Sequence, residues 1–503
     1  MSDSCPRAAS MCCVLAMVTL MAGCATATRT VPAEPTYALV ADRSSPLGRL
    51  AAAVTTGAGA DESALHLLAS GDDALTARLM LIEQAQRSVD LQYYIFRPDD
   101  SGLGLAAALW RAAQRGVRIR LLLDDWGARP DDRLLQNLAS HPNIEVRLFN
   151  PLPLRRARLL SLLLDFDRTH RRMHNKLMVA DGRAAIVGGR NVGNEYFTRR
   201  QEFAFADVDV LAFGPVVPQL ARGFDPFWND ALAAPVTPGA REPEGAPLKL
   251  TPAQAAEDGH HAFEERVMLG TLRRYVARAT AVQDEPGKLD PDRLPASAAI
   301  DQEIARVMGD VHSELLIVSP YFVPGEGGVE QLRALTARGV RVKVVTNSLA
   351  ATDVPAAHAG YARHRPALLD AGVRLYEIRA DAAAREQTRG RPGSSRLSLH
   401  AKVMVVDRAT TFIGSMNIDP RSLRLNTENG IVIESPALGS DVTDGVESAL
   451  TRDAWRVTRD GQALRWSGRE GDARVMLDDE PKVGLWLRLQ AAILSWLPIE
   501  ELL

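Results

Sequence analysis

Cysteine is almost absent from this sequence of 503 residues. Its four cysteines are Cys5, Cys12, Cys13 and Cys24, and all of them lie in the first 24 positions. The rest of the chain therefore cannot form a disulfide, which excludes the disulfide-stapled scaffolds of small secreted proteins. Dense clusters of Asp and Glu or of Cys and His are lacking as well, so the sequence indicates no metal ion and no other cofactor.

An excess of charge of one sign is also lacking. The 59 Lys and Arg residues nearly balance the 62 Asp and Glu residues, the formal net charge is −3, and there is no polybasic tail. Enzymes that act on nucleic acids usually display a basic surface, so this balance argues against a nuclease and against nucleic acid as a partner. Hydrophobic residues make up 46% of the chain, and its length is sufficient for two lobes with their own cores.

One short pattern is present twice. The first copy consists of His174, Lys176, Asp181, Gly188, Gly189 and Asn191, and the second of His400, Lys402, Asp407, Gly414, Ser415 and Asn417. Both copies read H-x-K-x4-D-x6-G-[G/S]-x-N, with identical internal spacing. Two such copies do not arise by chance at ordinary residue frequencies.

The spacing within each copy has a structural meaning. Residues 176–180 and 402–406 have the composition of strands, and side chains alternate between the two faces of a strand. The histidine and the lysine of each copy therefore point the same way. Asp181-Gly182 predicts a turn before a returning strand, and the glycines at the end of each copy let the backbone approach a bound group closely.

Two copies that face each other supply two imidazoles, two ammonium groups and two amides. This set of groups suits a phosphodiester. The lysines, with Asn191 and Asn417, can hold the nonbridging oxygens. One histidine can attack phosphorus while the other protonates the leaving oxygen, so the reaction requires no metal.

The duplication extends beyond the pattern. Residues 88–96 parallel residues 313–322, and residues 115–121 parallel residues 338–344. The latter pair is offset by 223 residues, close to the 226 residues that separate His174 from His400. A nearly constant offset indicates an internal repeat of strand, helix, strand and hairpin, with one helix expected over residues 103–114. The predicted fold class is α/β, with two similar lobes built on a mostly buried sheet.

The paired pattern resembles the signature of the phospholipase D superfamily. The resemblance implies transfer of a phosphoryl group through a covalent phosphohistidine without metal, at an active site between two α/β lobes. It favours His174 as the nucleophile and His400 as the acid, with Lys176 and Lys402 beside them. Asp181 and Asp407, which complete the candidate catalytic set, are expected to anchor the motif turns.

A phosphohistidine mechanism also benefits from a carboxylate that orients each imidazole. The family resemblance implies such an acid about thirty residues beyond each motif histidine. Asp207 lies 33 residues after His174, and Glu428 lies 28 residues after His400. We assign these two as the orienting pair, with Asp209 as a rival for the first position.

A finer resemblance connects residues 60–503 with the C-type bacterial cardiolipin synthases. It rests on residues 171–176, on residues 346–353 with the following His358 and Tyr361, and on residues 498–503. The resemblance implies phosphatidyl transfer through a phosphatidyl-histidine, with phosphatidylethanolamine and phosphatidylglycerol as lipids. Asn347, His358 and Tyr361 are candidate contacts of the headgroup or acceptor. Hydrolysis by a phospholipase D or another phosphodiesterase is the alternative, and a nuclease or a lipid-binding protein without turnover is a weaker one.

The N-terminus predicts a location. The apolar stretch 11–21 is too short for a membrane span, and it leads to Met21-Ala22-Gly23-Cys24, which resembles a bacterial lipobox. The resemblance implies a signal peptide over 1–23 and an acylated Cys24. Ala25 resembles the sorting pattern of outer-membrane lipoproteins. We therefore expect a membrane-anchored lipoprotein that faces the periplasm, held near membrane phospholipids by its acyl chains.

The remaining segments complete the expected domain organisation. We expect a flexible tether (24–62), a first lobe (63–235), a linker with a helix around 262–279 (236–300), a second lobe (301–440) and a C-terminal extension (441–503). The apolar stretch 485–497 of this extension favours a docked core helix over an interfacial one. The segment 155–164, with three arginines before five leucines, fits equally a lipid contact and a core helix with a solvated face.

Overall fold

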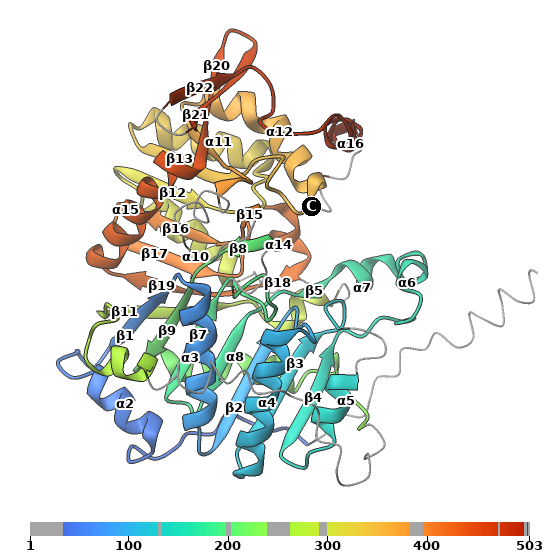
Figure 1. Cartoon of the computed structure of the whole chain (residues 1–503), viewed down its shortest axis with the longest axis vertical. Coiled ribbons are helices and arrows are strands. Elements are labelled where there is room, and N and C mark those ends of the chain that lie inside the picture. Colours follow the sequence, from blue (N-terminus) through green and yellow to red (C-terminus); the bar gives the residue numbers. More distant parts are fainter. Residues whose placement is uncertain are drawn as a thin grey trace, which may run out of the picture.

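The computed structural model describes residues 34–128, 133–197, 203–238, 262–290, 299–382, 396–470, 473–496 and 500. These residues form two lobes stacked along the long axis of the molecule, the first repeat in blue to green and the second in yellow to red (Figure 1). Each lobe carries helices on both faces of its sheet. The predicted α/β fold with two similar lobes is confirmed.

The first lobe alternates strands and helices. Its elements are α2 Pro46–Val54, β1 Glu62–Leu68, α3 Gly71–Gln84, β2 Ser88–Tyr93, α4 Asp100–Gln114, β3 Arg118–Asp124, α5 Arg133–Ala139, β4 Ile144–Phe149, α6 Arg158–Leu164, α7 Phe166–His170, β5 Arg172–Met173, β6 Leu177–Ala180, β7 Ala184–Gly188, β8 Phe203–Ala206, β9 Asp209–Phe213, α8 Val216–Trp228 and β10 Ala233–Pro235. The helix expected over 103–114 is α4, which begins earlier because the Asp99 side chain caps the amide of Gly102.

The second lobe repeats this order. Its elements are β11 Tyr275–Gln283, the 3₁₀ turn η1 Pro286–Leu289, α10 Ala299–Gly309, β12 Glu314–Val318, α11 Gly325–Ala337, β13 Arg341–Asn347, α12 Pro355–Asp370, β14 Arg374–Ile378, β15 Arg396–Leu399, β16 Val403–Val406, β17 Thr410–Gly414, α14 Pro420–Arg424, β18 Asn426–Thr427, β19 Asn429–Glu434, α15 Pro436–Asp453, β20 Ala454–Asp460, β21 Ala463–Glu470, β22 Ala473–Leu477 and α16 Leu485–Trp496.

One sheet runs through both lobes. In the first lobe the strands follow the order β4–β3–β2–β6–β7–β9–β1, and in the second lobe the matching order is β14–β13–β12–β16–β17–β19. The strand β11 pairs antiparallel with β1 on one side and with β19 on the other. Central strands such as β2 and β12 are buried along their whole length because helices cover both faces.

The apolar core has three parts. One lies between the first-lobe sheet and α2 to α5, and another lies between the second-lobe sheet and α10 to α12. The third is shared by the two lobes, with α8 and α15 packed on the remaining faces of the sheet. This shared core and β11 hold the two repeats in register, so residues of one repeat can reach residues of the other.

The expected tether is wrong for the described part of 24–62. Residues 46–54 form α2, which buries Leu47, Leu50 and Val54 against the first lobe. Upstream of α2, the backbone N–H of Thr36 donates to Asn229 Oδ1 at 3.1 Å. The missed signal was the start of the helix, where the Ser45 side chain caps the amide of Gly48. Residues 24–33 lie outside the described part of the chain.

The helix expected around 262–279 is correct only over its first part. Residues 262–268 are helical, whereas 275–283 form β11, in which buried and more exposed positions mostly alternate. This alternation is the pattern of a strand with one face covered. The expected lobe boundary at 440 is also wrong, because it falls inside α15, a helix of the second lobe.

The C-terminal helix differs from the expected core helix. None of the residues of α16 is buried, although the helix is rich in apolar side chains. Figure 1 shows α16 at the outside of the second lobe, next to α12. A search of the described residues for a helix that is long and apolar enough to cross a membrane finds none.

Candidate active site

Each copy of the motif forms a β-hairpin. Strands β6 and β7 carry the first copy, and β16 and β17 carry the second. The predicted turn is confirmed, since Asp181 and Gly182 have φ angles of 55° and 60°. In the second copy Asp407 and Arg408 have φ angles of 51° and 54°, so the same left-handed turn recurs without glycine.

The two motif aspartates lie at the turns of these hairpins. The Asp181 carboxylate accepts hydrogen bonds from the backbone amides of 86–88, at 2.7 to 3.0 Å. The Asp407 carboxylate accepts the equivalent bonds from the amides of 312–314, at 2.7 to 2.9 Å. A four-residue strand, about 13 Å long, separates each turn from its histidine. Both aspartates therefore anchor the hairpin to the next strand and lie away from the imidazoles.

We expect Asp407→Asn to lower the free energy of unfolding by about 1 kcal/mol, because its amide would turn an N–H toward a backbone donor. Burial alone would raise the pKa of Asp407, but the amides of Glu314, Ser313 and His312 lower it to about 2. The stabilisation is therefore fully present above the ordinary value of 3.8 and is lost as the pH falls through about 2. Urea unfolding of both proteins across this range measures the difference. A difference that stays constant down to about pH 2 would contradict this role.

Two short parallel ladders carry the histidines across the lobe boundary. The strand β5, just before His174, pairs with β18 of the second repeat. The strand β15, just before His400, pairs with β8 of the first repeat. Backbone hydrogen bonds extend both ladders, from His174 N to Thr427 O at 2.9 Å and from His400 N to Ala206 O at 2.8 Å.

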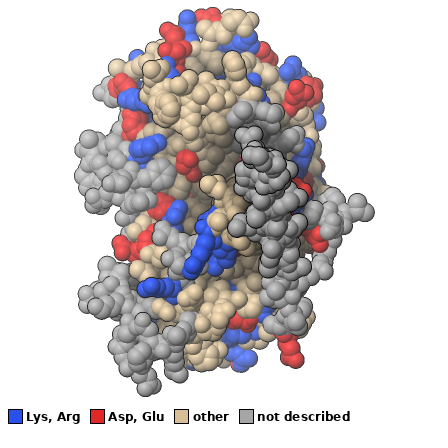
Figure 2. All heavy atoms as spheres, turned by 90° about the vertical axis from the view of Figure 1, so that its right-hand side faces the viewer, with Lys and Arg blue, Asp and Glu red and all other residues tan. Residues whose placement is uncertain are grey.

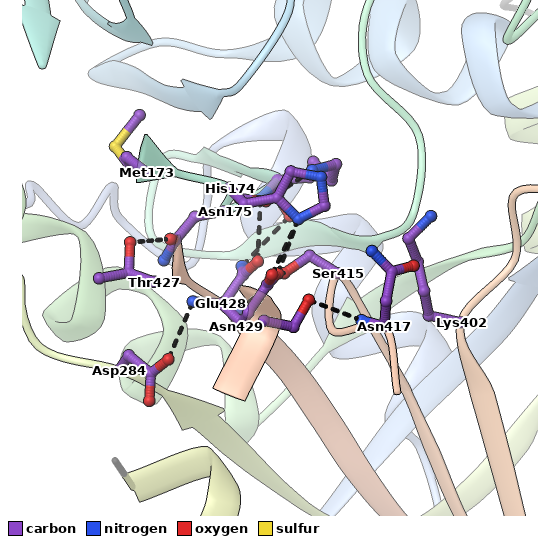
Figure 3. Close-up of polar contacts among 12 residues, drawn as sticks. Met173, His174, Asn175, Asp284, Lys402, Ser415, Asn417, Thr427, Glu428 and Asn429 are labelled. Carbon is purple, nitrogen blue, oxygen red and sulfur yellow. Dashed lines mark hydrogen bonds and ion pairs between the residues drawn. The ribbon is translucent and has the colours of Figure 1, made fainter. Parts of the chain in front are cut away.

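These ladders bring each histidine to the acid of the other repeat. His174 Nδ1 lies 2.8 Å from the Glu428 carboxylate (Figure 3), and His400 Nδ1 lies 2.7 Å from Asp207. The structure thus joins both assigned acids to the motif histidines, but crosswise and not within one repeat. The rival Asp209 forms a hydrogen-bonded ion pair with Arg78 at 3.0 Å.

The electrostatic surroundings keep both imidazoles neutral near physiological pH. Burial, reinforced by Lys176 and Lys402, lowers the pKa of His174 well below its usual value. Burial and Lys402 lower the pKa of His400 to about 4. A neutral imidazole that donates from Nδ1 to a carboxylate carries its lone pair on Nε2. Each histidine therefore has a basic, nucleophilic Nε2.

The two orienting acids differ from each other. Burial raises the pKa of Glu428 to about 7. Burial would also raise the pKa of Asp207, but His400 and Lys402 lower it to about 2. Asp207 is therefore the ionised partner, which can stabilise a protonated His400, whereas Glu428 lies close to its titration point beside His174.

The lysines are buried close to the imidazoles. Lys176 Nζ and Lys402 Nζ each donate to the carbonyl of the histidine two residues before. Burial lowers the pKa of Lys402 to about 8 and that of Lys176 well below its usual value. A bound anion favours the charged ammonium and raises these pKa values again. Both side chains are thus suited to receive a phosphate.

One position of the motif differs between the copies: it is Gly189 in the first copy and Ser415 in the second. A Cβ atom on Gly189 would lie 2.2 Å from Asp207 Oδ1, so only glycine leaves room for this carboxylate. In the second copy the Ser415 hydroxyl donates to the Glu428 carboxylate. The difference between glycine and serine therefore follows from which acid each copy supports.

We expect Gly189→Ala to lower turnover about 100-fold, because the added methyl displaces Asp207 from His400. Steady-state rates on phospholipid vesicles measure the loss. The matched control is Gly104→Ala, since no atom lies within 4 Å of a Cβ built on Gly104. Equal rates for Gly189→Ala and the wild type would contradict the close approach of Asp207.

The two motif asparagines differ in their contacts. Asn191 Oδ1 accepts from Ile95 N at 3.1 Å, and its Nδ2 donates to the Tyr196 hydroxyl at 3.0 Å. Among the described residues, Asn417 Oδ1 is buried and has no hydrogen-bond partner. Figure 3 shows the side chains of Asn417 and Lys402 next to each other. Asn417 is the better placed of the two to meet a ligand.

The three candidate substrate residues lie within the second lobe. Asn347 holds the backbone of Leu399, accepting from its N–H at 2.8 Å and donating to its carbonyl at 2.9 Å. This contact positions the chain directly before His400. His358 Nδ1 lies 3.3 Å from the Asn347 carbonyl, and the Tyr361 hydroxyl donates to Glu377 at 3.1 Å. The structure thus places all three in a buried polar network, where Asn347 positions His400.

Aromatic rings pack against both imidazoles, and the sequence interpretation missed them. Tyr94 contacts His174 edge to face, and Tyr196 contacts His400 in the same way, each with ring centres 5.2 Å apart. Tyr94 belongs to the repeated segment 88–96, which was the available signal. Such contacts restrict the rotation of each imidazole. Within the described part of the chain, no group of three or more His, Cys, Asp or Glu residues could hold a metal ion.

Known proteins show the same organisation. The family model of the cardiolipin synthase, PLD-like domain matches residues 79–228 and again 304–450. Cardiolipin synthase C of Escherichia coli strain K12 is 40% identical over 449 residues, which cover 86% of this chain and 94% of that protein. Cardiolipin synthase B of Salmonella typhi is 29% identical over 398 residues, which cover 78% and 82%.

A solved structure has a similar fold. The crystal structure of phosphatidylserine synthase from Haemophilus influenzae Rd KW20 aligns with a TM-score of 0.56 and 15% identity, over 87% of this chain and 95% of that chain. At this identity the likeness concerns the fold alone. The two family matches fall one in each lobe, and each contains one copy of the motif. The chain therefore belongs to the cardiolipin synthase family of phospholipase D-like proteins.

Proposed function

We propose that the protein is a phosphatidyltransferase of the cardiolipin synthase type. It moves the phosphatidyl group of one phospholipid to an alcohol group of another through a phosphatidyl-histidine. The observation that carries this proposal is the pair of buried neutral imidazoles, each beside a lysine and each held by a carboxylate of the opposite repeat. The membership of the family and the name of the 40% identical relative support the same activity.

In the first step His174 Nε2 attacks phosphorus, and the bond between phosphorus and the headgroup oxygen breaks. His400 gives a proton to the leaving oxygen. We assign the acid to His400 because the ionised Asp207 stabilises its imidazolium form. The bound phosphodiester adds a negative charge beside His400 and raises its pKa toward the physiological range.

In the second step the acceptor alcohol attacks phosphorus and the P–N bond to His174 breaks. His400, now neutral, takes the proton of the alcohol. Lys176, Lys402 and the amide of Asn417 hold the nonbridging oxygens in both steps. The two steps balance, since His400 loses a proton to the leaving oxygen in the first step and regains one from the acceptor alcohol in the second.

The charges around the two histidines support the proposed lipids. Arg421 contributes to the lowered pKa of His174, and its guanidinium donates to the His170 carbonyl at 2.9 Å. On the other side the exposed Asp353 accepts from the Tyr321 hydroxyl at 2.8 Å, and its charge partly opposes the effect of burial, which lowers the pKa of Lys402. The leaving group departs toward His400, so Asp353 can receive the ammonium of ethanolamine. Phosphatidylethanolamine is thus the proposed donor and phosphatidylglycerol the proposed acceptor.

We expect Asp353→Asn to reduce the preference for phosphatidylethanolamine over phosphatidylglycerol as donor about tenfold, because the variant loses the charge that pairs with the ammonium. Competition between the two donors, followed by mass spectrometry of the released headgroups, measures the preference. Asp310→Asn, which changes an exposed acid at the end of α10, is the control. An unchanged preference would remove Asp353 from headgroup recognition.

Lipid mass spectrometry tests the proposed function. The chain from residue 25 onward is incubated with vesicles of phosphatidylethanolamine and phosphatidylglycerol in the presence of a chelator, with His174→Ala as the control. New cardiolipin supports the proposal. Phosphatidic acid without cardiolipin would make water the acceptor and the protein a hydrolytic phospholipase D. No change in either lipid would overturn the proposal.

We also propose that the protein is an outer-membrane lipoprotein that faces the periplasm. The support is the sequence Met21-Ala22-Gly23-Cys24 after an apolar stretch, followed by Ala25. These residues, including the whole signal peptide over 1–23, lie outside the described part of the chain. Mass spectrometry of the mature N-terminus tests the acyl anchor, which Cys24→Ser should abolish, and fractionation of the two membranes tests the location.

A further inference from the structure

The segment 154–166 exposes an apolar surface that no other residue described by the structure covers. It contains α6, of which only Ser161 is buried. Leu159 and Leu163 are 80% and 82% exposed, and Leu160, Leu164 and Phe166 are exposed as well. Monomeric soluble proteins rarely leave several large apolar side chains together in water, and such patches mark interaction sites.

Arginines border this apolar surface. Arg155, Arg156 and Arg158 line a surface cavity of about 460 Å³ together with Leu159 and Leu160. Arg156 is exposed, whereas Arg155 pairs with Asp125 at 2.6 Å and Arg158 donates to the carbonyls of Trp126 and Ala128. Figure 2, which faces this side of the molecule, shows Lys and Arg side chains gathered near its middle. A cavity with cationic and apolar walls fits a lipid that has an anionic phosphate and acyl chains.

The segment lies close to the catalytic centre. It leads through α7 and β5 directly to His174. Arg158, the first residue of α6, acts electrostatically on Tyr94, whose ring contacts His174. The segment thus precedes His174 along the chain, and its Arg158 acts on the tyrosine that contacts the His174 ring.

A second apolar element projects from the same side of the molecule. Figure 1 shows α16 of the second lobe and α6 of the first lobe both at the right-hand edge. Trp486 and Trp496 of α16 are 77% and 88% exposed. Tryptophan is typical of side chains at the boundary between the acyl chains and the headgroups of a bilayer.

We propose that the segment 154–166 is a membrane-docking element whose leucines enter the interfacial layer of a bilayer while the exposed Arg156 binds an anionic phospholipid headgroup. α16 makes a second contact with the same bilayer. The occupant of this surface follows from charge complementarity, because apolar side chains bordered by arginines match an anionic lipid surface. The proposal rests on the proposed phospholipid substrate, and it explains how the lipid reaches His174.

Vesicle flotation tests the docking element. The chain from residue 25 onward, which contains every described residue, is mixed with vesicles of phosphatidylcholine alone or with phosphatidylglycerol added. We expect the wild type to float with the anionic vesicles, and Leu159→Ser combined with Leu163→Ser to lower the bound fraction at least about tenfold. Arg156→Glu lowers binding to the anionic vesicles alone. Trp486→Ser combined with Trp496→Ser reports on the contact made by α16.

A matched control and a second assay separate the possible outcomes. Met268→Ser combined with Leu269→Ser changes two exposed apolar residues beside α2 and leaves flotation unchanged. The double variant Leu159→Ser and Leu163→Ser, here called the leucine variant, should still turn over a short-chain phospholipid below its micelle concentration. It should no longer turn over the phospholipids of vesicles. Flotation of the leucine variant like the wild type would overturn the proposal. The proposal would also be overturned if the leucine variant no longer self-associated but still floated with the vesicles. The apolar patch would then join two copies of the chain.

The two proposals fail in different ways. Flotation that depends on the leucines, without turnover of any phospholipid, would overturn the proposed function and leave the docking element in place. Turnover of vesicles by the leucine variant at the wild-type rate would overturn the docking element alone.

Discussion

We expect His400→Ala to accumulate a phosphatidyl group on His174 when the phospholipid carries a weakly basic leaving group such as p-nitrophenol. Such a leaving group departs without a proton, so the first step no longer needs the acid. The second step still needs a base to take the proton of the acceptor alcohol, and the intermediate therefore persists. His174→Ala releases no p-nitrophenol from the same substrate, because the nucleophile itself is absent.

The same two variants behave alike on natural phospholipids. With ethanolamine or glycerol as the leaving group, we expect each variant to lower turnover by at least roughly 10⁴-fold, since residues that act as one unit are each indispensable. Intact mass and peptide mapping at neutral pH identify the modified residue. His312→Ala, which removes a largely exposed imidazole, is the control. A phosphatidyl group trapped on His400 in the His174→Ala protein would reverse the assignment, and substantial turnover by either variant would refute the two-histidine mechanism.

Asp207→Asn and Glu428→Gln should each lower turnover of natural phospholipids by about 10² to 10⁴-fold, because an amide no longer orients its imidazole in the required form. The crosswise contacts predict that the two variants then differ. The p-nitrophenyl substrate restores the first step in Asp207→Asn, since Asp207 serves His400, the acid that this substrate does not need. It does not restore Glu428→Gln, because Glu428 orients the nucleophile His174.

The first-step burst of p-nitrophenol, followed by stopped flow, measures this difference. Asp407→Asn makes the same change at a motif acid that lies at the far end of its hairpin, and its burst equals that of the wild type. If each acid served the histidine of its own repeat, Glu428→Gln would be the variant that recovers. The experiment therefore tests which carboxylate orients which histidine, independently of thermal stability.

Much of the site could be predicted from the sequence. The motif residues lie within eighteen positions of one another, and the alternation of a strand places His174 with Lys176 and His400 with Lys402. The turn at Asp181 also followed from a local signal, the glycine after it, and the turn at Asp407 from the repeat of the motif. The orienting acids were found by counting along the chain, but their partners were not. Which imidazole they contact depends on the pairing of β5 with β18 and of β8 with β15.

The errors in the expected fold and site have different causes. The alternation that marks β11 is present in the sequence, and so is the cap of α2, yet we predict a helix for the first segment from its polar pattern and a tether for the second from its composition. For α16 the apolar composition was read correctly, but the neighbour that would cover it was assumed. For Asn347 the type of residue suggested a ligand contact, whereas its amide is occupied by the backbone of Leu399.

The sequence by itself determined the family, the internal duplication and the chemical groups of the site, because these depend on residue types at short, regular spacings. Only the tertiary structure decided that the acids cross between the repeats, since each contact joins residues 193 or 254 positions apart. It also decided that α6 and α16 leave large apolar side chains exposed. Burial depends on which surfaces the folded chain brings together, and strand pairing over such distances leaves no periodic trace in the sequence.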